Sequence, residues 1–148
     1  MMRIIHKTLI LSMLLSFVFS CSSCGQNVAS GTSMEFSFNT GTPADSTDEK
    51  TIYICKDMEK LELNAKLIVD SGDVTVQVVN TSSNETVWNH SYDENTNFKI
   101  ELTDLKADSE YLLKITIVQS KKVNLAITTE EKLVKDKDKP DKYNIEKE

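Results

Sequence analysis

The chain has 148 residues, which is room for one domain and little more. It contains 17 basic and 23 acidic residues, and residues 1–20 hold two of the basic residues and none of the acidic ones. Without that segment, the chain has 15 basic and 23 acidic residues, which gives it a formal net charge of −8. This charge argues against nucleic acid and anionic lipid as binding partners.

The N-terminus is typical of a secretory signal peptide. Arg3 and Lys7 give it a positively charged start, and an apolar stretch interrupted only by serines runs from Leu9 to Phe19. This stretch is shorter than the ~20 apolar residues that a membrane-spanning helix needs. We therefore predict a signal helix over residues 1–20 that is removed on export.

The residues before Cys21 resemble the lipobox of bacterial lipoproteins. Val18 supplies the aliphatic residue at −3 and Ser20 the small residue at −1, whereas Phe19 at −2 is bulkier than is usual. Cys24 is a rival attachment site, but it would place Cys21 where an aliphatic residue belongs. The resemblance implies cleavage before Cys21, lipid attachment to its sulfur and acylation of the new amino group, with acyl chains such as palmitate. It implies that the protein is lipid-anchored at the extracytoplasmic face of the cell membrane.

A small-residue segment follows the predicted attachment site. Residues 22–33 are polar and rich in glycine and serine, so we predict that residues 21–33 form a flexible, lipidated tether. An exported location permits a disulfide between Cys24 and Cys55. The alternative is that Cys55 is a buried apolar residue of a strand.

From Met34 to Thr129 the dominant sequence period is two, which predicts strands with one buried and one solvated face. Polar turn segments separate about eight such runs, as in a sandwich or barrel. No intervening segment has helical length and periodicity, which argues against a βαβ architecture. We therefore predict an all-β, antiparallel β-sandwich over residues 34–129. The expected strands cover 34–38, 51–56, 61–69, 74–78, 86–92, 98–102, 111–117 and 123–127, with a polar loop over 40–50.

The segment from Leu105 to Tyr111 resembles the tyrosine corner of fibronectin type III domains. Leu105, Lys106, Glu110 and Tyr111 match that pattern, whereas Ala107 and Asp108 replace its Pro-Gly pair. The resemblance implies an immunoglobulin-like sandwich in which the Tyr111 ring fills the end of the core and its hydroxyl bonds backbone upstream. That family carries its core tryptophan on an early strand, and the single tryptophan here lies mid-domain, so a jelly roll is the alternative.

The tail, residues 130–148, is nearly all charged and contains few apolar residues. Thr128 and Glu131 have the spacing of a helix capping box, and Pro140 would limit such a helix to a few turns. We expect disorder or a short helix there.

Catalytic groups are scarce in this sequence. After residue 20 the chain has one histidine, His90, no nucleophile motif and no metal-ligand spacing, so we predict no catalytic residue, no metal and no cofactor. Trp88, His90 and Tyr92 share one face of a strand, and they form either an exposed strip for a ligand such as a sugar or part of the core. Asp70 and Asp73 lie in a turn, where calcium binding is an alternative to simple solvation.

The sequence therefore leaves three classes of function open. The first is a non-catalytic binding or adhesion module that recognises a protein or glycan and contacts the membrane through its anchor. The second is an accessory or inhibitor lipoprotein of an envelope complex, and the third is a small hydrolase. We favour the first, with binding assigned to the polar segments 40–50, 80–85 and 93–97.

Overall fold

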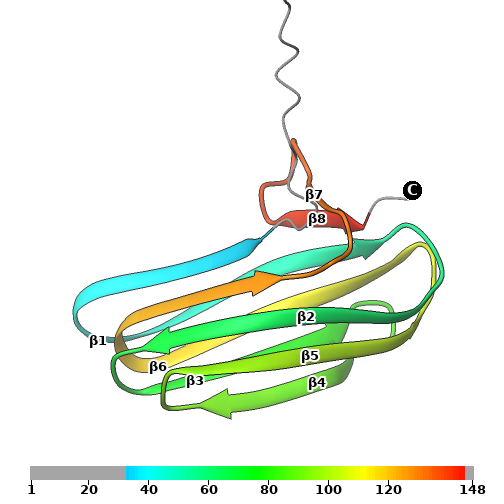
Figure 1. Ribbon diagram of the computed structural model, residues 1–148. Helices are drawn as coiled ribbons and strands as arrows, with labels where there is room; N and C mark the ends of the chain where they lie inside the picture. The colour runs from blue at the N-terminus through cyan, green and yellow to red at the C-terminus, as the bar shows by residue number, and fades with distance from the viewer. Residues whose placement is uncertain (1–32, 146–148) are drawn as a thin grey trace, which may run out of the picture.

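The structure is a computed structural model that describes residues 33–145 (Figure 1). The described chain forms eight β-strands: β1 (Met34–Ile54), β2 (Met58–Val69), β3 (Asp73–Asn80), β4 (Glu85–Tyr92), β5 (Thr96–Leu105), β6 (Ser109–Thr128), β7 (Leu133–Lys135) and β8 (Lys142–Ile145). Between residues 33 and 145 there is no helix able to cross a membrane. The prediction of an all-β fold is confirmed, and the predicted signal helix lies outside the described residues.

The strands are hydrogen-bonded into one mixed sheet that folds over on itself into two layers. Layer A has the order β4, β3, first half of β6, second half of β1, β8 and β7. Layer B has the order β5, β2, second half of β6 and first half of β1. All strand pairs are antiparallel except the parallel pair β1–β8. The predicted β-sandwich is thus the observed architecture.

Two long strands pass through both layers, which the sequence did not indicate. The expected strands 34–38 and 51–56 lie in or overlap one strand, β1, and the expected strands 111–117 and 123–127 are both part of β6. The predicted loop over 40–50 was wrong, because this segment continues β1 with register irregularities between Asn39 and Ser46. The partner bend in β6 lies at Gln119, whose φ is 54°.

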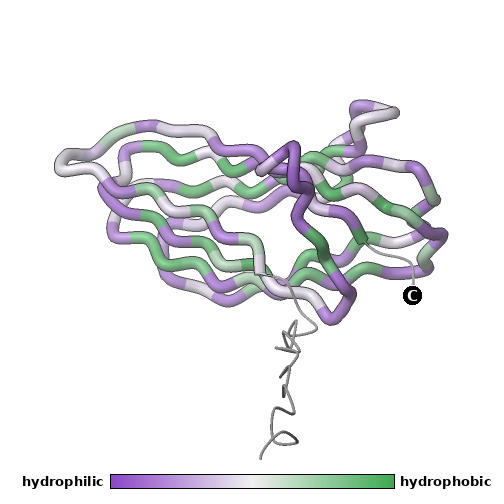
Figure 2. The backbone as a smooth tube through the Cα atoms, turned by 90° about the horizontal axis from the view of Figure 1, so that it is seen from above, coloured by the Kyte–Doolittle hydropathy of each residue, from purple (hydrophilic) through white to green (hydrophobic). Residues whose placement is uncertain are grey.

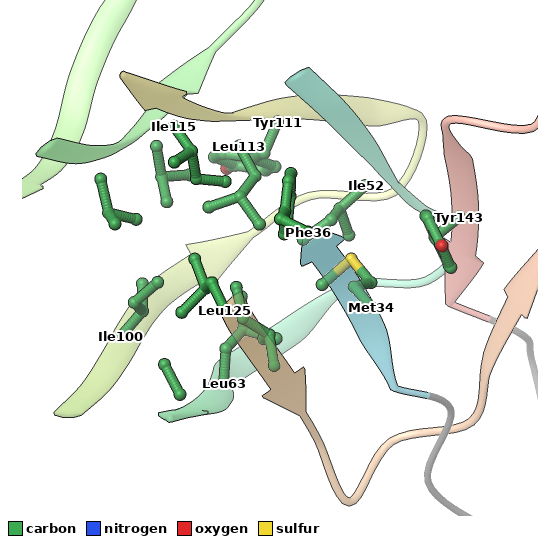
Figure 3. Packing of buried hydrophobic residues seen from close by; sticks show 14 of the residues in the cluster. Met34, Phe36, Ile52, Leu63, Ile100, Tyr111, Leu113, Ile115, Leu125 and Tyr143 are labelled. Atoms are coloured by element: carbon green, nitrogen blue, oxygen red, sulfur yellow. The ribbon is translucent and has the colours of Figure 1, made fainter. Parts of the chain in front are cut away.

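The core lies between the two layers and consists of the inward-facing residues of the alternating strands. The alternation of hydrophobic and hydrophilic residues along the strands is visible in Figure 2. Leu63 and Ile100 come from layer B, Leu113 and Ile115 from layer A, and all four are buried (Figure 3). Burial of branched aliphatic residues on both layers provides the main stabilisation of a sandwich of this kind.

The C-terminal tail is part of the fold, so the prediction of disorder or a short helix was wrong. β8 pairs with β1 from Thr51 to Ile54, and β7 pairs with β8. Tyr143 faces the side of the core that holds Met34 and Ile52 (Figure 3). Three apolar tail residues are buried: Leu133, Tyr143 and Ile145. The β-structure therefore extends beyond residue 129 to residue 145.

Candidate functional site

Four connections gather at one end of the sandwich, which we call the distal end. They are the β1 bend (40–45), the β2–β3 turn (70–72), the β4–β5 turn (93–95) and the β6 bend (119–122), as the strand registers require. The start of β1 and the tail strands lie away from this end (Figure 1). Of the segments predicted to bind, 40–50 and 93–97 contribute to the distal end, whereas 80–85 lies at the opposite end.

Asp70 holds the β2–β3 turn against the β6 bend. Its Oδ1 accepts hydrogen bonds from the Ser120 hydroxyl at 3.0 Å and from the backbone N–H groups of Lys121 and Lys122 at 3.2 and 3.0 Å. These hydrogen bonds, led by the one from Lys122, hold the pKa of Asp70 below its usual value. The Asp70 carboxylate therefore acts as a structural hydrogen-bond acceptor that joins the two segments.

Two further side chains brace the distal end. Asp45 Oδ1 accepts hydrogen bonds from the backbone N–H and the side-chain amide of Gln119, at 2.8 and 3.0 Å. Asn95 Oδ1 accepts one from the backbone N–H of Val69 at 2.8 Å. Each bond joins segments far apart in the sequence, so the four connections form one ordered surface. Pre-ordered surface of this kind lowers the entropic cost of binding a partner.

Exposed aliphatic side chains border this surface. Ile68 on the outer face of layer B is 41% exposed, and Val118 on the outer face of layer A is 42% exposed. Val118 directly precedes the β6 bend, and Ile68 lies two residues before the β2–β3 turn. A third exposed aliphatic residue, Val87 at 42%, lies on β4 toward the other end. The distal end thus combines fixed polar groups with accessible apolar surface.

The predicted strip of Trp88, His90 and Tyr92 lies on the inward-facing side of the edge strand β4. The Trp88 and Tyr92 rings are half-buried and both stack on Phe98 of β5, with centroid distances of 5.6 and 4.5 Å. His90 is exposed and meets the two other rings edge-on, at 5.2 and 6.0 Å. Burial raises the pKa of Tyr92. The strip therefore closes the margin between the two layers, and His90 is its accessible member.

The structure places Leu105 and Tyr111 in the core, on either side of the β5–β6 turn that crosses between the layers. Within the described residues, the Tyr111 hydroxyl does not form the upstream backbone bond that a tyrosine corner implies. Other groups hold this turn: the Asp108 N–H donates to the Ile54 carbonyl at 2.8 Å, and the Ala107 N–H donates to Asp57 Oδ1 at 2.8 Å. Asp108 in this turn has a positive φ, and so does Asp104 near the end of β5.

The predicted lipid-attachment residue, Cys21, and its rival Cys24 lie outside the described residues. Cys55 is a free, half-buried thiol directly after β1. In the part of the chain that the structure describes, no cluster of three or more His, Cys, Asp or Glu side chains is placed to hold a metal ion.

Sequence reasoning missed the bracing roles of Asp45 and Asn95. Asp45 falls in the segment mistaken for a loop, so its pairing with Gln119 had no signal in the sequence. Asn95 lies in a polar turn segment, where asparagine side chains commonly accept backbone hydrogen bonds. That local preference did not indicate its partner, Val69, which lies on a different strand.

A family model described as Domain of unknown function (DUF4624) matches residues 22–141. No curated protein matches the chain. Among solved structures the chain is similar to PirA, with a TM-score of 0.48, 10% identity, and coverage of 66% of this chain and 92% of that one.

Two further solved structures are similar over part of their length. One is the enzymatically active domain of bacteriophage CBA120 tailspike protein 4, with a TM-score of 0.39, 7% identity, and coverage of 70% of this chain and 20% of that one. The other is the arabinose-bound MgGH51 α-L-arabinofuranosidase, with a TM-score of 0.34, 16% identity, and coverage of 66% and 18%. Likenesses this distant carry no argument about activity.

Proposed function

The chain belongs to the DUF4624 family, whose description names no activity, and we propose that it is a lipid-anchored envelope lipoprotein with a non-catalytic binding domain. Its β-sandwich binds a protein or glycan through the distal end. Its contact with the membrane is made by the anchor at Cys21 and not by the acidic surface of the domain.

One observation carries the binding proposal: the four distal connections are joined by side-chain hydrogen bonds into one ordered surface. Loops that are positioned by a rigid scaffold are the usual recognition elements of sandwich domains.

The exposed Ile68 and Val118 side chains favour a protein partner over a glycan. Aliphatic side chains contribute to a protein interface when they are removed from water, and polar groups around them fix the register. This observation also supports the second candidate function, an accessory or inhibitor lipoprotein that docks on another envelope protein. In both cases the binding surface is the same.

The experiment compares the wild-type lipoprotein with an Ile68→Ser/Val118→Ser double variant and with Val87→Ser. Val87 is as exposed as the other two but lies away from the distal end, so it is the matched control. We expect partners captured by cross-linking from detergent-solubilised envelopes to be lost in the double variant and retained in the control. Equal capture by all three proteins, with folding confirmed by circular dichroism, would assign binding to another surface.

A further inference from the structure

The margin of the sandwich opposite the aromatic strip contains an open strand edge. Residues 44–50 of β1 pair with β6 on one side, and among the described residues no strand occupies their other side. From Thr51 onward β8 occupies that side, and the Thr51 N–H donates to the Asp141 carbonyl at 2.7 Å. Because backbone groups alternate in direction along a strand, the N–H and C=O groups of Thr47 and Glu49 face the open side.

A cleft lies between the two halves of β1, beside this open edge. It has a volume of about 140 Å³ and is lined by apolar side chains from both layers: Phe36, Phe38, Ile115, Ile117 and Val123. Ser46 and Asp48 also line it. A cavity of ~150 Å³ accommodates a group of the size of benzene. The cleft therefore has room for one apolar side chain delivered from the open edge.

The charges at this edge are acidic. Asp48 and Glu49 lie on it. The neighbouring Lys50 is largely buried, and its ammonium group lies 4.7 Å from the centre of the Phe36 ring and 3.5 Å from the Asp141 carboxylate. Glu49 has its own partner in Lys114, at 3.6 Å. The Asp48 carboxylate is thus the charged group that lies at both the edge and the cleft.

Asp48 also caps the edge in the absence of a partner. Its Oδ1 accepts a hydrogen bond from the Glu49 N–H at 2.8 Å, so one of the outward donors is satisfied within the chain. Inward-facing charges and capped donors are devices by which edge strands avoid indiscriminate pairing. A carbonyl of an added strand would replace Asp48 at this N–H and release its carboxylate to a cationic side chain.

We propose that the open edge of β1 over residues 44–50 binds an extended basic peptide as an added strand beside β8. The β1–β8 pair shows that this edge accepts a strand. The cleft takes one apolar side chain of the peptide, and Asp48 pairs with a basic one. Strand addition of this kind draws affinity from backbone hydrogen bonds and specificity from pockets for alternate side chains. This edge meets the distal end only at residues 44 and 45, and its outward backbone groups, the cleft and Asp48 lie beyond that bend. The inference therefore stands independently of the proposed function.

The test uses the purified full chain in detergent and a capped hexapeptide of alternating lysine and valine. Capped hexapeptides of alternating glutamate and valine, and of alternating lysine and serine, are the controls for charge and for the apolar side chain. We expect the lysine–valine peptide to bind and to slow amide hydrogen exchange over residues 44–50. Equal binding of either control peptide, or protection confined to another segment, would overturn the proposal.

Two variants locate the contact. Thr47→Pro removes an outward N–H without removing a bond to β6, and it should abolish the protection. Asp48→Asn keeps the fold even if the proline variant does not, and it should weaken binding several-fold, whereas Asp93→Asn in an exposed turn should not. Unchanged binding by Asp48→Asn would contradict the role of its charge and with it the proposal.

Discussion

The hydroxyl of Tyr53 donates a hydrogen bond of 2.5 Å to Oδ1 of Asp108, and this bond ties the end of β1 to the β5–β6 turn. Asp108 has a φ of 62°, a backbone conformation that residues with a side chain rarely adopt. The bond from Tyr53 and the bond between the Asp108 N–H and Ile54 hold it there. The crossover between the layers is therefore fixed by a tyrosine of β1.

Tyr53→Phe should weaken this crossover and alter stability at high pH. The hydrogen bond to Asp108 is the main reason that the pKa of Tyr53 lies above its usual value of 10.0. A raised pKa means that the bond stabilises the fold fully below pH 10 and is lost as the pH rises through the folded-state pKa. Alkaline denaturation followed by circular dichroism should show a smaller loss of stability above pH 10 in the variant than in the wild type.

Tyr111→Phe tests whether the hydroxyl of Tyr111, like that of Tyr53, stabilises the crossover. A tyrosine corner predicts a loss of ~1–3 kcal/mol when the Tyr111 hydroxyl is removed, because a buried backbone group loses its partner. The hydrogen bonds of the described residues instead predict a small change. If a denaturant melt of Tyr111→Phe shows the full loss of stability, the tyrosine-corner assignment would be supported.

Gly72→Ala should be strongly destabilising. Gly72 has a φ of 73°, and an added Cβ would lie 2.1 Å from the carbonyl oxygen of Val118. The left-handed conformation alone costs ~1–2 kcal/mol for a residue with a side chain, and the overlap with β6 backbone adds to it. Gly41→Ala is the control, since a Cβ added to Gly41 would have no neighbouring atom within 4 Å. Urea denaturation of the two variants should differ clearly, and equal midpoints would be inconsistent with the packing of the β2–β3 turn on β6.

Asp70→Asn should change how the free energy of unfolding depends on pH under acidic conditions. Hydrogen bonds led by that from the Lys122 N–H lower the pKa of Asp70 from 3.8, so its contribution is present above pH 3.8 and is lost as the pH falls through the folded-state pKa. Denaturant melts between pH 2 and 6 should show a shallower decrease for Asp70→Asn than for the wild type. Asp73→Asn, an exposed residue next to the same turn, should retain the wild-type profile.

Ile145→Ala should destabilise the whole sandwich and not only the tail. The Ile145 side chain is fully buried and pairs in register with Ile54 of β1. Truncation of a buried isoleucine costs about 2–5 kcal/mol, because apolar contact is lost and a cavity is left. Lys137→Ala in the exposed β7–β8 turn is the control. If thermal melts of the two variants coincide, the tail strands do not contribute to the core.

Cys21→Ser should abolish membrane anchoring. The lipobox-like sequence before Cys21 predicts an acylated sulfur, and several acyl chains hold a protein stably at a bilayer. Detergent phase partitioning should therefore place the wild type in the detergent phase and Cys21→Ser in the aqueous phase or in an unprocessed form. Cys24→Ser should behave like the wild type. Equal partitioning of the wild type and Cys21→Ser would refute the anchor.

The central strands were predictable because their apolar residues alternate without interruption. Leu61, Leu63 and Leu67 on β2 are buried as their period indicates, and the same holds for Val74, Val76 and Val78 on β3. The tail was missed because β8 offers only Tyr143 and Ile145 amid charged residues. Its pairing with β1 is parallel and distant in sequence, and such pairing has no local signature.

The bends in β1 and β6 were missed for a related reason. Residues 45–50 are polar, yet Ser46, Asp48 and Lys50 occupy inward positions opposite Ile117, Ile115 and Leu113. A run of polar residues at the margin of a sheet has the sequence pattern of a loop, because the neighbouring residues do not indicate that β6 pairs with it. The arrangement of the distal end could not be predicted for the same reason, because Asp45 and Gln119 form their hydrogen bond only when both strands bend.

The passage of β1 and β6 through both layers also sets the order of events in folding. β1 is the first strand of the described domain to be synthesised, yet its neighbours are β6 and β8, and its register joins Met34 to Ile127. Contacts so distant in sequence carry a large loop-closure entropy, which makes folding slow compared with that of helical proteins. Neither layer is complete without both long strands, so the layers form together. The complete sandwich can therefore form only once the sequence through β6 and β8 is available.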